Sequence, residues 1–121
     1  MHDLTKYLAI PQSVKKRVWE RDAGKCVLCG TRRMTNPNAH YIARSQLGLG
    51  IDERNIFTAC WPCHEAYDNS EHRHAIKEQL RAYLQGRYGE NWVKNEDELK
   101  YHKGQEYIIK EFEYEQNYID W

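Results

Sequence analysis

Cys26-Val-Leu-Cys29 and Cys60-Trp-Pro-Cys63 are the two stretches that decide the fold of this chain of 121 residues. They contain all four of its cysteines, as two Cys-x-x-Cys turns separated by residues 30–59. Zinc binds four ligands in a tetrahedron, and each such turn supplies two thiolates from one tight loop. With no cysteine left over, this spacing predicts one structural zinc site.

Two disulfide bonds are the alternative use of these four cysteines. No hydrophobic leader precedes Cys26, so we expect a reducing, cytoplasmic environment in which disulfides are rare. No stretch approaches the roughly 20 apolar residues of a membrane span, so we expect no membrane as a partner. The sequence therefore favours the zinc site.

The formal net charge of zero hides an uneven distribution of charge. Residues 1–88 contain 14 Lys and Arg against 9 Asp and Glu, whereas residues 89–121 contain 4 against 9. A basic body attracts polyanions such as nucleic acids, although an ordinary solvated surface would also account for the asymmetry. We predict a domain at residues 1–89 and an acidic, Tyr-rich C-terminal extension at residues 90–121.

The periodicity of apolar residues and the positions of turn residues predict a small α+β fold. Two short strands, at residues 39–43 and 54–59, are expected to form a hairpin. Helices are expected at four places: residues 11–22, the stretch that runs from the second cysteine turn past position 68, residues 70–85 with Ser70 as the N-cap, and residues 96–102.

The residues between and after the cysteine turns resemble the HNH nuclease family. His40 and Asn55 are separated by 14 residues, and Asn55 and His64 by eight, which is normal for that family. The resemblance covers about residues 10–69. It implies a small zinc-stapled ββα-metal finger with flanking helices, and a metal-dependent endonuclease. Such an enzyme hydrolyses DNA phosphodiester bonds by nicking or cutting, and leaves 5′-phosphate and 3′-hydroxyl ends.

The resemblance also implies roles for single residues. His40 would be the general base, since an imidazole titrates near neutral pH. Asn55 would hold the loop and orient the His40 ring through a backbone carbonyl. His64 would bind a catalytic divalent ion, either Mg²⁺ or Mn²⁺/Ni²⁺. Asp68 follows His64 by four residues, on the same helix face, and is either a second ligand of that ion or an exposed helix residue.

Ala39 departs from the family pattern, because Asp or His usually precedes the general base as a metal ligand. A methyl group coordinates nothing, so the ion would depend on His64, Asp68, substrate and water. Mg²⁺ tolerates a water-rich shell, and softer ions suit an imidazole ligand. Two further hypotheses follow: a catalytically weakened, zinc-stabilised nucleic-acid-binding module, and an interaction module that docks on a protein partner through residues 106–121.

Basic and hydroxyl side chains are candidates for contacts with DNA phosphates. Each alone competes with simple solvation, and only the cluster favours DNA. The chain resembles no base-reading module, so we expect weak sequence preference. His72 and His74 face different ways on a helix; His72 is expected at the surface and His74 there or on the phosphate track. The candidates are Arg44, Ser45, Lys15, Lys16, Arg32 and Arg33, with Arg73 and His74 extending the track.

Overall fold

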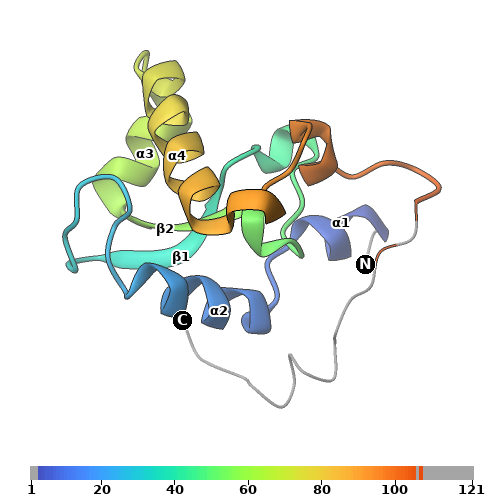
Figure 1. The fold of residues 1–121 in the computed structure, drawn as a ribbon, viewed down its shortest axis with the longest axis horizontal. Helices are drawn as coiled ribbons and strands as arrows, with labels where there is room; N and C mark the ends of the chain where they lie inside the picture. Colours follow the sequence, from blue (N-terminus) through green and yellow to red (C-terminus); the bar gives the residue numbers. More distant parts are fainter. Residues whose placement is uncertain (1–2, 106, 108–121) are drawn as a thin grey trace.

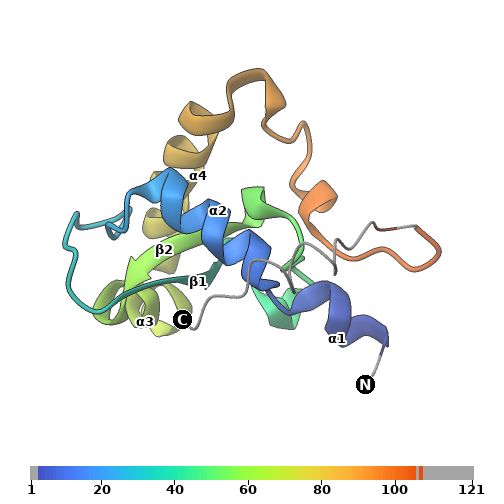
Figure 2. The same ribbon diagram turned by 90° about the horizontal axis from the view of Figure 1, so that it is seen from below.

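A two-stranded antiparallel sheet lies between one helix on one side and two helices on the other (Figures 1 and 2). The computed structural model describes residues 3–105 and 107. The sheet is made of β1 (Thr35–His40) and β2 (Ile56–Cys60). The helices are α1 (Asp3–Leu8), α2 (Gln12–Asp22), α3 (Trp61–Asn69) and α4 (Arg73–Tyr88), with 3₁₀ turns at Arg44–Gln46, Glu53–Asn55, Gly89–Asn91 and Glu96–Leu99. The small α+β fold is therefore confirmed.

The first strand begins earlier than the sequence predicts. A strand was expected at residues 39–43, but β1 runs from Thr35 and ends at His40. Its register against β2 shifts between Asn36 and Ala39, next to Pro37, which has no N–H to donate. Such an irregularity allows proline inside a short edge strand. The polar, proline-containing stretch that indicated a turn is therefore half of the hairpin.

The helix after the second cysteine turn is confirmed, and the next one is shifted. Ser70 ends α3 instead of starting α4, which runs from Arg73 through Gly86 to Tyr88. Its last turn is closed by Gly89, whose φ is 52°. The helix continues through Gly86, so the expectation that this glycine ends it is wrong. The short helix α1 was not predicted.

The main hydrophobic core extends past the predicted domain boundary at residue 89. Val93 and Leu99 belong to the same buried cluster as residues of both strands, α3 and α4. The Leu49 N–H donates to the Leu99 carbonyl at 2.8 Å, and the Tyr101 N–H donates to the Leu47 carbonyl at 2.8 Å. Residues 90–101 are therefore packed on the body. None of the helices in the described ranges has the length and apolar character needed to cross a membrane.

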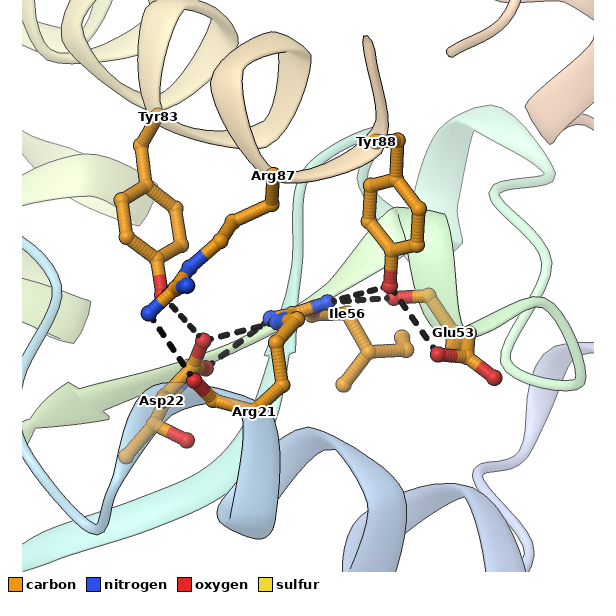
Figure 3. A network of polar contacts seen from close by, with 8 residues as sticks. Arg21, Asp22, Glu53, Ile56, Tyr83, Arg87 and Tyr88 are labelled. Carbon is orange, nitrogen blue, oxygen red and sulfur yellow. Dashed lines mark hydrogen bonds and ion pairs between the residues drawn. The ribbon is translucent and has the colours of Figure 1, made fainter. Parts of the chain in front are cut away.

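A buried ion pair ties α2 to the sheet and to α4 (Figure 3). The fully buried Asp22 carboxylate accepts hydrogen bonds from Arg21 Nε at 2.7 Å, the Tyr83 hydroxyl at 2.5 Å and the Thr58 N–H at 2.9 Å. Arg21 also donates to the Ile56 carbonyl at 2.8 Å. Burial alone would lower the pKa of Arg21, but Asp22 and Tyr88 together outweigh it and the pKa is raised. Arg21 therefore remains charged in the interior.

Replacing Arg21 by Leu is expected to lower the free energy of unfolding by about 3–5 kcal/mol, because the Asp22 carboxylate would be left buried without its cation. Arg87→Leu is the matched control. Arg87 is exposed, and its side chain donates hydrogen bonds to the Tyr83 hydroxyl at 3.3 Å and the Arg21 carbonyl at 3.2 Å. We therefore expect this control to lower the free energy of unfolding by less than about 1 kcal/mol. Urea unfolding measures the free energy of unfolding of both variants. Equal losses would contradict the stabilising role of the ion pair between Arg21 and Asp22.

Candidate metal centre and active site

The four cysteine side chains meet at one point, although they come from two distant parts of the chain. Cys26 and Cys29 lie in the loop after α2, Cys60 ends β2, and Cys63 is in the first turn of α3. Their sulfur atoms all lie within 4.8 Å of one another. All four cysteines are free thiols, so the disulfide alternative is not observed. The cluster is arranged to hold a single metal ion.

The turn between the first two cysteines directs backbone N–H groups at sulfur. Gly30 adopts a φ of 81°, and its N–H donates to the Cys26 carbonyl at 2.9 Å. The Cys29 N–H lies 3.5 Å from Cys26 Sγ. Burial would raise the pKa of Cys26, but N–H groups of Cys60, Cys29 and Leu28 lower it to about 7. Burial raises the pKa of Cys63.

A second group of polar side chains surrounds a pocket of about 430 Å³ beside α3. It includes His40, His64 and Asp68, three of the four residues that the sequence placed at the catalytic centre, whereas Asn55 does not line it. The first comes from the end of β1 and the other two from α3. The pocket is also lined by Ala43, Arg44, Ser45, Gln46, Asn69 and Arg73.

The His40 ring is held by a carbonyl from the N-terminal helix. His40 Nε2 lies 2.9 Å from the carbonyl oxygen of Leu8, the last residue of α1. A carbonyl only accepts, so Nε2 carries the hydrogen and Nδ1 retains its lone pair. Burial lowers the pKa of His40 below 6.5, aided by the Arg44 and His64 charges and opposed by the Leu8 bond and Asp68. The ring is therefore neutral at pH 7.

Asn55 holds the loop that carries the 3₁₀ turn at the pocket. Its fully buried side chain accepts from the Ile42 N–H at 2.7 Å and donates to the Ile42 and Leu49 carbonyls at 3.2 and 2.9 Å. The expectation that Asn55 orients the His40 ring through a backbone carbonyl is wrong. The carbonyl that contacts the ring belongs to Leu8. The Asn55 carbonyl instead accepts from the backbone N–H of Tyr41, at 2.7 Å.

His64 and Asp68 contact each other across one turn of α3. His64 Nε2 and Asp68 Oδ2 are 3.2 Å apart, and the two side chains are 24% and 45% exposed. The expectation that they share one helix face is confirmed. Ala39, in contrast, is fully buried in the main core. Among the described residues, the four cysteines are the only group of three or more His, Cys, Asp or Glu close enough to bind one ion.

The predicted phosphate-binding residues do not form one surface. Arg44 and Ser45 line the pocket, as does Arg73, which donates to the Tyr67 carbonyl at 2.8 Å. The remaining five candidates do not line it. Lys15 and Lys16 lie on α2, on the other side of the sheet (Figure 1), Arg32 and Arg33 lie in the exposed loop before β1, and His74 is exposed on α4.

The sequence analysis missed the Leu8 carbonyl, Gln46 and Asn69. Gln46 and Asn69 come from the two segments that flank the pocket, so their nearness to Ser45 and Asp68 was the available signal. No protein-family model matches this chain, and no curated protein or solved structure gives a significant match. The function of the site therefore has to be inferred from its own geometry.

Proposed function

We propose that this chain is a metal-dependent HNH endonuclease that hydrolyses phosphodiester bonds of DNA. The observation that supports it best is the pocket, which is lined by His40, whose Nδ1 lone pair is not used by the Leu8 carbonyl, and also by His64 and Asp68. Arg44, Ser45 and Arg73 surround the same space and offer donors to a phosphate. One general base, two metal ligands and phosphate-binding side chains make up a hydrolytic site.

The four cysteines suit a structural zinc ion. A tetrahedron with Zn–S bonds of about 2.3 Å places its sulfurs about 3.8 Å apart. Cys29 Sγ and Cys60 Sγ are 3.6 Å apart, and all four sulfurs lie within 4.8 Å. With every position taken by sulfur, such a zinc has no open site for water and acts as a clip between the first loop and α3.

His64 and Asp68 suit a catalytic ion that completes its shell with water. A nitrogen and a carboxylate oxygen 3.2 Å apart can contact the same cation, and Mg²⁺ usually binds through one or two protein ligands. The imidazole favours Mn²⁺ or Ni²⁺ over Mg²⁺. When bound, the ion supplies a Lewis acid that stabilises negative charge on the phosphoryl and leaving oxygens.

Each side chain of the site has one role in the proposed reaction. His40 Nδ1 takes a proton from water as the water oxygen bonds to phosphorus. Arg44 and Arg73 hold the non-bridging oxygens, and Ser45 donates a further hydrogen bond. The bond from phosphorus to the 3′ oxygen breaks, and that oxygen takes a proton from solvent. The products are a 5′-phosphate and a 3′-hydroxyl.

The test is relaxation of supercoiled plasmid by the full chain, with Mg²⁺, Mn²⁺ or Ni²⁺ added singly. We expect relaxation with at least one ion, and none with Asp68→Ala at the same ion concentration. Asp97→Ala is the matched control, because Asp97 is an exposed carboxylate outside the pocket. If the chain relaxes plasmid with none of the three ions, the proposal is contradicted.

Ala39 supports a second candidate, a zinc-stabilised nucleic-acid-binding module with weakened catalysis. The fully buried methyl group leaves two protein donors for the catalytic ion. The same experiment separates the two: the module retards the plasmid in a gel, yet leaves it supercoiled with every ion. The remaining hypothesis is a protein partner that binds residues 106–121. Apart from Tyr107, these residues lie outside the described ranges.

The cutting rate is expected to fall in acid with a midpoint below pH 6.5. His40 works as a base only when neutral, and burial lowers its pKa below 6.5. The rate is therefore level at and above neutral pH and is lost as pH falls through the lowered pKa. Plasmid assays over a pH series measure the midpoint, and a value at or above 6.5 would contradict the role of His40.

Gly50→Ala is expected to reduce cutting by about tenfold or more, since misplacing a catalytic group by about 1 Å costs up to about 100-fold. A Cβ at Gly50 would lie 2.3 Å from the carbonyl oxygens of both Leu8 and Ala9, so the end of α1 has to move. Leu8 then no longer holds His40. Gly86→Ala, which has open space around its Cβ, is the control and should cut normally.

A further inference from the structure

Two large apolar side chains lie exposed beside the cysteine cluster. Met34 and Trp61 are 68% and 59% exposed. They are neighbours in space, because the Trp61 N–H donates to the Met34 carbonyl at 3.2 Å and the next residues, Thr35 and Cys60, pair across the sheet. Exposed large apolar side chains that adjoin each other mark a binding surface.

The surroundings of this pair carry positive charge. Arg32 and Arg33 are both exposed and directly precede Met34, whose φ of 57° is uncommon for a side chain of its size. Glu65 is exposed one turn after Trp61 on α3, so the neighbourhood of Trp61 and Met34 carries two guanidinium groups and one carboxylate. We call Arg32, Arg33, Met34 and Trp61 the Trp61 patch. Its charge complements a polyanion.

We propose that the Trp61 patch binds a single-stranded segment of nucleic acid, with an unpaired base stacked on the indole of Trp61. Every base offers a flat face, and stacking on an aromatic side chain needs no particular sequence. Arg32 and Arg33 bind the phosphates on either side of that base. A duplex keeps its bases stacked on one another and offers the indole nothing equivalent.

The patch and the pocket lie along one side of α3. His64 and Asp68 follow Trp61 by three and seven residues, which places all three on neighbouring faces of the helix. Seven residues rise about 10 Å along a helix axis. A nucleic-acid strand of a few nucleotides can span that distance. The cleaved bond would thus lie a few nucleotides from the unpaired base; this link to cleavage, unlike binding itself, depends on the proposed function.

The test is binding of fluorescently labelled oligothymidylate to the full chain without added divalent ion, followed by anisotropy. Trp61→Ala is expected to weaken binding about tenfold, in line with the loss of one stacked base. Trp61→Phe should restore affinity to within about twofold, because its ring also stacks. Binding of a blunt duplex should change by less than about twofold with either variant, since no base is unpaired. An oligouridylate tells whether RNA binds the patch more tightly than DNA.

The charges are tested separately. Replacing Arg32 and Arg33 together by Ala should reduce the slope of log affinity against log salt by about 1.4 for the single strand. Lys103→Ala, which removes an exposed cation outside the Trp61 patch, should leave the slope unchanged. Zinc content and melting temperature should match the unaltered chain in all variants.

Two results would overturn the inference: single-strand affinity that Trp61→Ala does not change, and duplex affinity that falls as much as single-strand affinity. These outcomes do not depend on cutting. If the chain binds oligothymidylate through Trp61 but never relaxes plasmid, this inference stands and the proposed nuclease activity is contradicted. If it relaxes plasmid but does not bind oligothymidylate through Trp61, the nuclease proposal stands and this inference is overturned.

Discussion

His40→Ala is expected to lower the rate of metal-dependent plasmid relaxation by about 10³-fold, within the range of general acid–base catalysis. The Leu8 carbonyl fixes the tautomer of His40, so Nδ1 of this ring is the proton acceptor in the pocket. Alanine removes that acceptor but leaves His64, Asp68 and the phosphate-binding side chains in place. Binding of intact plasmid, measured by gel retardation, should therefore remain.

His74→Ala is the matched control, because His74 is an exposed histidine on α4 that does not line the pocket. It should cut at the rate of the unaltered chain. Both variants should melt as the unaltered chain does. Cutting by His40→Ala within about tenfold of the normal rate would remove His40 from the mechanism, since general bases contribute at least about 10²-fold.

Cys60→Ser is expected to abolish the folded state. Structural zinc sites contribute about 10–16 kcal/mol of apparent binding free energy, whereas whole domains are stable by only about 5–15 kcal/mol. Cys60 joins β2 to α3, so loss of the metal frees both from the first loop. Elemental analysis should give about one zinc for the unaltered chain and none for the variant, whose thermal scan should lack a cooperative transition.

Cys29→Ser separates metal binding from packing. Cys60 is buried and Cys29 is exposed. If the sulfurs act as ligands of one zinc, both serine variants unfold, and chelation of the unaltered chain produces the same state. If Cys60 matters only as a buried side chain, Cys29→Ser melts normally. That second outcome would refute the zinc site.

The parts of the site that sequence predicted well are those set by local spacing. A Cys-x-x-Cys turn brings two sulfurs together whatever surrounds it, and four residues on a helix bring His64 to Asp68. The loop-holding role of Asn55 was also expected. The fold class followed from the same local signals, because two short extended segments and amphipathic helices were recognisable in the chain.

The parts that sequence missed depend on competing contacts, some local and some distant. Ser70 has the side chain of an N-cap, but its Oγ accepts from the His72 N–H and its carbonyl from the Arg73 N–H, within the turn between two helices. The strand before Ala39 contains a proline, and only pairing with β2 makes it a strand. Propensity is a weak guide wherever tertiary pairing competes with it.

The Leu8 carbonyl has a consequence for how this protein is compared and engineered. Any amino acid at position 8 can offer the same backbone oxygen, so substitution patterns at that position carry no record of the contact. A shortened version that starts at Pro11 would retain every residue of the recognisable motif and would still lack the atom that orients its imidazole. Expression trials and fusions should therefore keep residues 3–10, because the end of α1 supports the candidate site.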